Sequence, residues 1–502
     1  MKRKLIMSAK EAIAMVRDGD VLATGGFIGS GLAETLNIEI EKKFLETGHP
    51  RNLTLVYTAG QGSKEGQGNE HYSHAGMVKR VIGGHWGKCP KMGKLANENK
   101  IEAYNFPQGV ISQMYRDIAI QRGFTISHVG LGTFVDPRLD GGKLNEVTKE
   151  ELVKVVEIEG KELLLYKHVP IDVCLIRATF ADERGNVSFD HEPFHLDATS
   201  LAQACKASGG KVLVQVKQVV KAGTIDPRMV KIPGIYVDAL VVSKPEEHEQ
   251  SIGVYFDSSV SGETNAYVAK VSKGDLNSKK IIARRAAFEL QKDAVINLGI
   301  GTPEVIADVA VEENIEEDFT LTIESGIVGG IALGGHQFGV ARNPEAIMDH
   351  RLQFDFYDGG GLDMAFLGLA EVDAKGNVNV SKFGMLIAGA GGFINITQNA
   401  KKVCYCGTFM ASGSKKKFVK KVQQITFSGT NAKKAKQPVL FITERAVFRL
   451  EEDGVHLIEI APGMDIERDI LLHMDFKPII DESLCEMDER IFLDRPMGLK
   501  LK

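Results

Sequence analysis

The chain has 502 residues, 43% hydrophobic and 25% charged, a balance typical of a soluble globular protein with roughly two to four domains. Its formal net charge of −5 is small for this length. The charge therefore gives no reason to expect nucleic acid or a membrane surface as the partner. Its six cysteines include no C-x-x-C pair, which excludes a disulfide framework and a zinc ribbon.

Glycine is the one residue type in excess. It makes up 53 of the 502 residues, against a usual share of about 7%, and it clusters beside strand-like runs. Such clusters indicate backbone that turns tightly or approaches a ligand closely. The apolar run after the basic N-terminus stops at Met7, which is too short for a signal peptide. We therefore expect a cytoplasmic protein.

The first elements follow the order of an open α/β layer fold. Ser8 and Glu11 form a capping-box pattern that opens a short helix. A strand over 21–24, a glycine loop over 25–31 and a helix from Leu32 come next. Helix, strand, glycine loop and helix in this order predict a layered α/β domain.

A polar segment follows, and after it the sequence again predicts a helix and a strand. From Ser243 to Lys280 it is polar and mixed in charge, as an interdomain connection would be. A predicted helix over 279–290 and a predicted strand over 294–298 follow. We therefore expect an N-terminal domain over 1–242, a connecting segment over 243–280 and a C-terminal domain over 281–502.

Two short motifs recur in the same order in both halves. The matching pairs are Gly29-x-Gly31 with Gly299-x-Gly301, and Asp182-x-x-Gly185-Asn186 with Asp373-x-x-Gly376-Asn377. Ordered matches of this kind predict two related α/β domains, the second more compact. Two such layers packed around a shared active site would bind their ligand at the carboxyl ends of the strands.

The segment over 319–326 holds the leading candidate for chemistry. Five residues of strand-forming type lead into Glu324, which is followed by Ser325 and Gly326. No charged residue occurs from Ser325 to Ala341. A carboxylate at the end of a buried strand, facing an uncharged glycine-rich wall, could act as a nucleophile. The alternatives are a helix-capping acid and a salt-bridged core glutamate.

Two further stretches could meet a substrate. Gly389, Gly391 and Gly392 lie in a second charge-free stretch, where their N–H groups could face an oxyanion; a tight turn in a buried hairpin is the alternative. Gln108 follows Pro107 on a predicted turn and could hold a carboxylate without an ion pair. Otherwise it is a solvent-facing turn residue.

Other cofactor and metal patterns are incomplete. The glycine runs near the strands depart from the dinucleotide fingerprint, so a nicotinamide enzyme is not indicated. His85 lies beside paired glycines and could act as a base, but no nucleophile-elbow Ser or Cys accompanies it. The acids Asp355, Asp358 and Asp363 flank three glycines with a spacing that fits no calcium loop. We expect no metal.

Several of these motifs together resemble the family I CoA-transferases, from about Leu5 to the last predicted strand. The motifs are Gly-Gly-Phe after the first strand, Pro107-Gln108-Gly109, Gly299-x-Gly301-x-Pro303, Glu324-Ser325-Gly326 and Gly389-x-Gly391-Gly392-Phe393. Within the family, residues 354–363 and 387–399 look most like the propionate/acetate CoA-transferases. Succinyl-CoA:3-oxoacid members usually read Ser-Glu-Asn-Gly at the nucleophile, so the Ile323-Glu324-Ser325 sequence here favours short monocarboxylates.

The resemblance also implies roles. Glu324 would attack an acyl-CoA, pass through an acyl-glutamyl anhydride and become a glutamyl-CoA thioester. Gly391 and Gly392 would line the oxyanion and thioester site, and Gln108 would orient the substrate carboxylate. The CoA-binding positions it implies are Gly299, Gly301, Gly389 and Phe393. No cofactor would be permanently bound, because coenzyme A is a substrate and part of the covalent intermediate.

The expected partners are acyl-CoA and short-chain carboxylic acids, and the family implies a homo-oligomer, a dimer or tetramer. Two other functions stay open. An acyl-CoA hydrolase of the same fold would let water resolve the intermediate. A non-catalytic acyl-CoA or carboxylate sensor would form no covalent intermediate at all.

Overall fold

The structure is a computed structural model that describes residues 5–267, 275–412 and 415–502. The basic N-terminus and part of the expected connecting segment lie outside the described residues. Contacts divide the chain into two compact units. Unit 1 comprises Met1–Asn265, Glu324–Asp355 and Met385–Gly392, and unit 2 comprises Ala266–Ile323, Phe356–Gly384 and Phe393–Lys502.

The two units interleave along the chain, whereas the expected domains 1–242 and 281–502 are continuous stretches. Glu324–Asp355 and Met385–Gly392 belong to the C-terminal range by sequence but make most of their contacts within unit 1. Residues 243–265, expected in the connecting segment, also belong to unit 1. The evolutionary domain boundaries stay a prediction.

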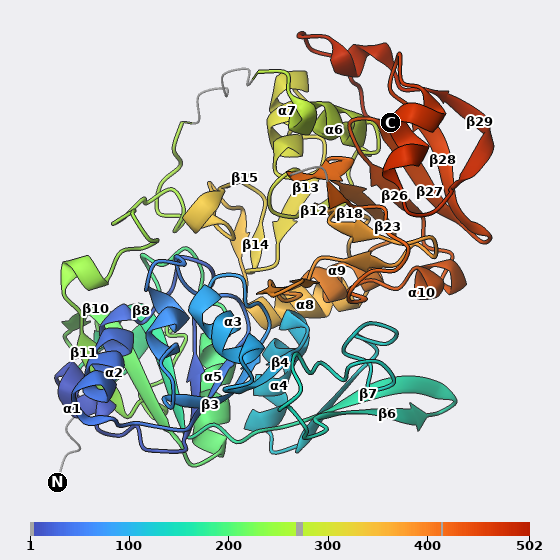
Figure 1. Cartoon of the computed structure of the whole chain (residues 1–502). Coiled ribbons are helices and arrows are strands. Elements are labelled where there is room, and N and C mark those ends of the chain that lie inside the picture. The colour runs from blue at the N-terminus through green and yellow to red at the C-terminus, as the bar shows by residue number, and fades with distance from the viewer. Residues whose placement is uncertain (1–4, 268–274, 413–414) are drawn as a thin grey trace. The chain divides into compact units, whose positions relative to one another are not determined.

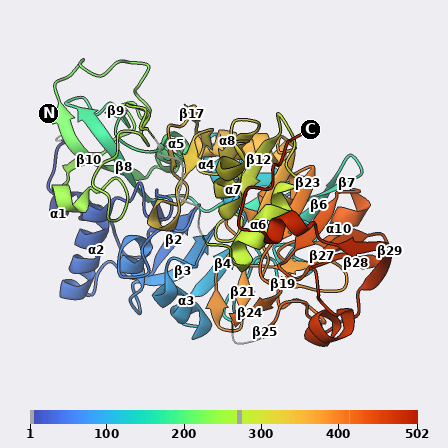
Figure 2. The same ribbon diagram turned by 90° about the horizontal axis from the view of Figure 1, so that it is seen from above.

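Unit 1 is built on a parallel sheet with the order β11-β10-β8-β1-β2-β3-β4, onto which β9 pairs antiparallel (Figure 1). Its strands are β1 (Val21–Thr24), β2 (Leu53–Tyr57), β3 (Val78–Gly83), β4 (Glu102–Asn105), β8 (Val173–Asp182), β9 (Val187–Ser188), β10 (Lys211–Val220) and β11 (Ala239–Val242). The helices of this unit include α1 (Ala9–Ile13), α2 (Glu34–Thr47), α3 (Pro90–Asn97), α4 (Gln108–Ala119) and α5 (Ala198–Ala207). In Figure 2 the green β8 and β10 lie beside the blue α1 and α2, so distant parts of the sequence are neighbours.

Smaller elements complete unit 1. A separate antiparallel sheet has the order β5-β7-β6, formed by β5 (Phe124–Ser127), β6 (Val153–Ile158) and β7 (Lys161–Lys167). The segment after Glu324 adds β14 (Ile327–Val328) and β17 (Ala346–Ile347), and then β15 (Ile331–Ala332) and β16 (Ala341–Arg342), each pair antiparallel. Helix α8 (His350–Asp358) begins in this unit.

Unit 2 holds a mixed sheet that includes the order β13-β12-β18-β23-β26-β27-β28-β29. Its strands are β12 (Val295–Leu298), β13 (Thr320–Ile323), β18 (Met364–Gly368), β23 (Lys402–Cys406), β26 (Val439–Ile442), β27 (Ala446–Glu451), β28 (Gly454–Ile460) and β29 (Ile479–Glu486). Its helices include α6 (Ser278–Ala287), α7 (Val305–Glu313), α9 (Phe393–Asn399) and α10 (Gly429–Lys434), and the hairpin β19 (Glu371–Val372) with β20 (Val378–Asn379) leaves the sheet. The two sheets confirm the α/β class.

The strand order repeats between the units. In unit 2, β26-β23-β18-β12-β13 follows the same order as β11-β10-β8-β1-β2 in unit 1. The Val21 N–H donates to Asp172 at 2.8 Å, and at the matching place the Val295 N–H donates to Asp363 at 2.8 Å. Glu324 after β13 therefore corresponds to Thr58 after β2.

The repeated Asp-x-x-Gly-Asn motif forms the same turn twice. Asp182 accepts hydrogen bonds from the N–H of Asn186 at 3.0 Å and from its side-chain amide at 3.0 Å, and Asp373 receives the matching pair from Asn377 at 3.1 and 3.0 Å. Each asparagine oxygen then accepts from a glycine N–H at 3.0 Å. The internal repeat seen in the sequence is thus a structural one, since turns of equal sequence satisfy the same backbone groups.

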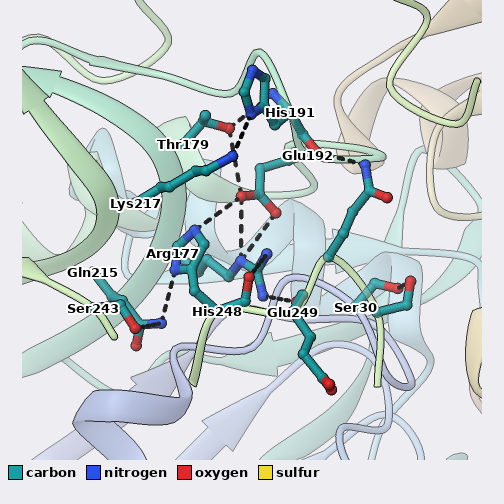
Figure 3. Close-up of polar contacts among 12 residues, drawn as sticks. Ser30, Arg177, Thr179, His191, Glu192, Gln215, Lys217, Ser243, His248 and Glu249 are labelled. Carbon is teal, nitrogen blue, oxygen red and sulfur yellow. Dashed lines mark hydrogen bonds and ion pairs between the residues drawn. The ribbon is translucent and has the colours of Figure 1, made fainter. Parts of the chain in front are cut away.

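A buried charge cluster fixes residues 248–251 onto unit 1 (Figure 3). The Arg177 Nε lies 3.1 Å from the Glu192 carboxylate, and its guanidinium also donates to the Glu249 carbonyl. Burial alone would raise the pKa of Glu192, but the Arg177 charge and His248 hold it at about 2. This ion pair is therefore charged on both sides at neutral pH.

Replacing Arg177 by methionine should destabilise unit 1 strongly. Glu192 would remain buried without its counter-charge, and breaking a buried pair in this way costs about 3–5 kcal/mol. The expected result is a lower unfolding midpoint in urea at pH 7. Arg177→Met with Glu192→Leu is the control, since removing both charges should recover much of the loss. A single variant as stable as wild type would contradict this role.

Among the described residues, no helix combines the length and apolar character needed to cross a membrane.

Candidate active site

The Glu324 side chain starts at a rigid turn. Glu324 follows β13 directly, and the buried Ser325 hydroxyl donates to the Gly339 carbonyl at 2.6 Å. Gly326 has φ of +111°, and a side chain there would meet the Met348 carbonyl oxygen at 2.2 Å. Only glycine fits this position. The strand end and the turn therefore fix the direction in which the Glu324 side chain leaves the backbone.

The Glu324 carboxylate faces Gly392. A Cβ placed on Gly392 would lie 3.0 Å from the Glu324 Oε2 and 3.2 Å from the Phe354 ring. The carboxylate makes no hydrogen bond or ion pair with the described residues, so neither sequence alternative, a capping acid or a salt-bridged glutamate, describes it. Its side chain is partly accessible, as a group that meets a substrate must be.

The electrostatics of this carboxylate are unusual. Loss of hydration raises the pKa of Glu324 to about 7. A poorly hydrated carboxylate is a stronger nucleophile than one in water, provided that it is ionised. Nearby, burial together with the charges of Lys88 and Lys64 lowers the pKa of His85 to about 4. His85 is therefore neutral at pH 7.

The glycine loop before Gly392 is held by main-chain hydrogen bonds. The Gly391 N–H donates to the Gly84 carbonyl at 2.7 Å, and the Gly391 carbonyl accepts from the Gln108 N–H at 3.0 Å. The expectation for the Gly391 N–H therefore needs correction, because this donor is already used within the protein. No hydrogen bond from the Gly392 N–H is formed with the described residues, and a Cβ on this residue would lie 3.0 Å from the Glu324 Oε2.

Gln108 lies inside unit 1 and not on a solvent-facing turn. It is 1% exposed and begins α4. A Cβ on Gly391 would lie 3.6 Å from its Oε1, and its Nε2 lies 2.9 Å from the Nε2 of His350. The fold thus places three predicted site residues, Glu324, Gln108 and Gly392, in one unit. The same unit contains His350.

His350 is a residue that the sequence did not single out. It is fully buried at the start of α8, and its Nδ1 lies 2.8 Å from the Asp197 carboxylate. Its partners lie 153 and 242 positions away along the chain. No local motif could have indicated it.

The four predicted CoA positions are distributed over both units. Gly389 lies in unit 1, where a Cβ would meet the Trp86 nitrogen at 2.8 Å. Gly299, Gly301 and Phe393 lie in unit 2. Gly299 packs on Leu367, Gly301 has φ of +89°, and Phe393 stacks on Tyr405 with ring centroids 5.8 Å apart. Their role in CoA binding stays a prediction.

The acids near the three glycines 359–361 have protein partners. Asp358 accepts from the Asn395 amide at 2.9 Å, Asp363 pairs with Lys401 at 2.7 Å, and Asp355 pairs with Arg351. Within the described parts of the chain, no three His, Cys, Asp or Glu residues gather as metal ligands.

Comparisons with known proteins agree with this geometry. A family model described as coenzyme A transferase matches residues 6–243. The chain is 44% identical to the acetate CoA-transferase YdiF of Escherichia coli K12, over 99% of this chain and 96% of that protein. It is 41% identical to the caffeate CoA-transferase of Acetobacterium woodii, over 98% of each.

A solved structure extends the match to the fold. The thioester complex with CoA of acyl-CoA transferase YdiF from E. coli O157:H7 is 44% identical and matches with a TM-score of 0.93, over 99% of this chain and 98% of that one. Similarity of sequence and fold along nearly the whole length shows that this chain belongs to the family I coenzyme A transferases.

Proposed function

We propose that the protein is a short-chain acyl-CoA:carboxylate CoA-transferase of the acetate or propionate type, with Glu324 as its nucleophile. The observation that carries this proposal is the Glu324 carboxylate, poorly hydrated and unpaired among the described residues, facing Gly392 so closely that a Cβ there would lie 3.0 Å from the Glu324 Oε2. The acetate CoA-transferase and the CoA thioester complex among its relatives support the same reaction.

The reaction proceeds by two successive acyl transfers, the first from the donor to Glu324 and the second from the resulting anhydride to the CoA thiolate. Its carboxylate attacks the thioester carbonyl of the donor, and the CoA thiolate leaves to give a mixed anhydride. The thiolate then attacks the glutamyl carbonyl of that anhydride and releases the donor acid as a carboxylate. Glu324 is now a CoA thioester, and an incoming carboxylate reverses both steps and leaves as the new acyl-CoA. No proton is consumed.

The neighbouring residues stabilise and orient these species. The Gly392 N–H is suited to the oxyanion that develops on the attacked carbonyl, since preorganised donors lower such barriers strongly. Gln108 orients the substrate carboxylate through its amide. CoA has a long non-reacting tail, which supplies binding energy that excludes water from the anhydride. The working protein is a cytoplasmic homo-oligomer.

Intact-mass spectrometry tests this proposal. Wild-type protein incubated with acetyl-CoA or propionyl-CoA, and no acceptor acid, should gain one CoA-sized adduct that maps to the peptide containing Glu324. Release of free thiol without an acceptor would indicate the hydrolase instead. A protein that forms no adduct and turns over nothing would be the sensor.

The pH dependence of the reaction should report the Glu324 carboxyl. Attack requires the ionised form, and burial raises the pKa to about 7. Below pH 7 the ionised fraction, and with it kcat/KM, should therefore fall about tenfold per pH unit. Substrate carboxylates stay ionised there, because their pKa values lie near the ordinary range of about 4–5. Rates measured from pH 4 to 8.5 check this, and an acid limb near pH 4.5 would contradict it.

A further inference from the structure

A hydrogen-bonded chain of buried side chains lies behind Gln108. The Ser112 hydroxyl donates to one carboxylate oxygen of Asp197, whose other oxygen lies 2.8 Å from the Nδ1 of His350. The Nε2 of His350 lies 2.9 Å from the Nε2 of Gln108. All four residues belong to unit 1. This series of hydrogen-bonded side chains ends at the Gln108 amide, which faces Gly391.

These contacts select one tautomer of His350. A carboxylate only accepts hydrogen bonds, so the Nδ1 opposite Asp197 must carry the proton. An amide nitrogen only donates, so the Nε2 opposite Gln108 must keep its lone pair. His350 is then neutral and donates to Asp197 while accepting from Gln108. In this arrangement the Oε1 of Gln108 lies on the Gly391 side, 3.6 Å from a Cβ placed on Gly391.

Asp197 contacts His350 and does not cap helix α5. It occupies the N-cap position of α5, where an aspartate usually accepts from the first N–H groups of the helix, yet its side chain makes no capping hydrogen bond. It is 6% exposed, and the cavity beside it, lined also by Tyr115 and His195, has a volume of only about 20 Å³. Bulk water therefore cannot compete for the carboxylate.

We propose that Asp197 and His350 are positioning residues of the transfer reaction: Asp197 fixes the tautomer of His350, and His350 fixes the orientation of the Gln108 amide. The inference rests on the proposed function for its effect on catalysis. The Gln108 Nε2 gives one N–H to His350 and keeps the other for the substrate carboxylate, which only accepts hydrogen bonds. An amide that turned over would present its oxygen to that carboxylate in part of the molecules. The Asp197–His350 pair removes that alternative.

The neighbouring His195–Asp349 pair supplies a matched control. His195 Nδ1 lies 2.9 Å from the Asp349 carboxylate, and this pair joins the same two segments as Asp197 and His350. It has no contact with Gln108 among the described residues. The two pairs are therefore alike in chemistry and differ in whether they reach the Gln108 amide.

The first test reads the tautomer without using activity. In protein labelled with ¹⁵N-histidine, the His350 ring should show a protonated Nδ1 and an unprotonated Nε2, with His350→Gln used for assignment. Asp197→Asn should reverse this pattern, because the Ser112 hydroxyl donates to the new amide oxygen, which leaves the amide nitrogen to donate to Nδ1. An imidazolium, or an Nε2-protonated ring, in the wild-type protein would overturn the inference.

The second test is a double-mutant cycle on kcat/KM for CoA transfer to acetate. Asp197→Asn should lower kcat/KM about 10- to 100-fold, as expected when one hydrogen bond is inverted, while Asp349→Asn should not. In a Gln108→Ala background, Asp197→Asn should cause no further loss, because contacting residues that act through one another are not additive. Equal losses in both backgrounds would mean a merely structural role and would overturn the proposal.

Thermal unfolding of each variant shows whether it is folded. Should wild-type protein form no CoA adduct, the proposed function fails, and the tautomer measurement still decides the positioning. Should the adduct form while Asp197→Asn leaves kcat/KM unchanged, the proposed function stands and the positioning role fails. The two failures are thus distinguishable.

Discussion

Replacing Glu324 by glutamine should abolish CoA transfer, with a fall in kcat on the order of 10⁴-fold or more, the usual size of the loss when a nucleophile is removed. The amide has the same shape but cannot form the anhydride or the thioester. Steady-state transfer from acetyl-CoA to propionate measures the rate, and intact mass should show no adduct. Glu345→Gln is the matched control, since Glu345 is an exposed glutamate of the same chain segment. A Glu324→Gln protein that keeps normal activity would eliminate the proposed mechanism.

The same variant should be more stable than wild type at pH 8. The pKa of Glu324 is raised from 4.5 to about 7 in the folded protein, so the folded state holds its proton more tightly than the unfolded state. The stabilisation this provides is complete below pH 4.5 and is lost as the pH rises to about 7. Glutamine has no such charge to bury. The expected gain at pH 8 is about 1–3 kcal/mol, and it should vanish at pH 4.

Gly392→Ala should reduce kcat by about 10-fold while the protein stays folded. The added Cβ would lie 3.0 Å from the Glu324 Oε2, a tight contact that the carboxylate must relieve by a shift of a few tenths of an ångström. Because a displacement of about 1 Å at a reacting group can cost about 10²-fold in rate, this smaller shift should cost about 10-fold. The position has an ordinary φ, so backbone strain does not contribute. Kinetics of CoA transfer and thermal unfolding together measure the effect.

Gly93→Ala supplies the control for that substitution. Gly93 lies in α3, and a Cβ there would meet no atom within 4 Å. It should leave kcat unchanged and stabilise the helix slightly, by about 0.5–1 kcal/mol. If Gly392→Ala retained full activity, the close approach to Glu324 would have no catalytic meaning. If both variants lost activity, the effect would not be specific to the site.

Local sequence patterns determined much of this protein. The predicted strands over 53–57 and 294–298 appear as β2 and β12, because short apolar runs between glycine turns have few other stable conformations. The glycine at 326 was conspicuous because a turn there needs a positive φ. The repeated Asp-x-x-Gly-Asn turn forms its hydrogen bonds within the motif itself. Both copies could therefore be predicted from residue types alone. Glu324 was a candidate for a different local reason, because it is a lone carboxylate at the end of a predicted strand.

Only the tertiary structure decided what surrounds that carboxylate. The commitment of the Gly391 N–H to Gly84 and the path from Asp197 through His350 to Gln108 depend on residues up to about 300 positions apart. The raised pKa of Glu324 depends on how much water the folded chain excludes. A sequence pattern records the preferences of neighbouring residues, whereas desolvation and donor–acceptor matching are set by distant segments that meet when the core packs. The sequence could therefore indicate the proposed nucleophile, but not the loss of hydration that raises its pKa.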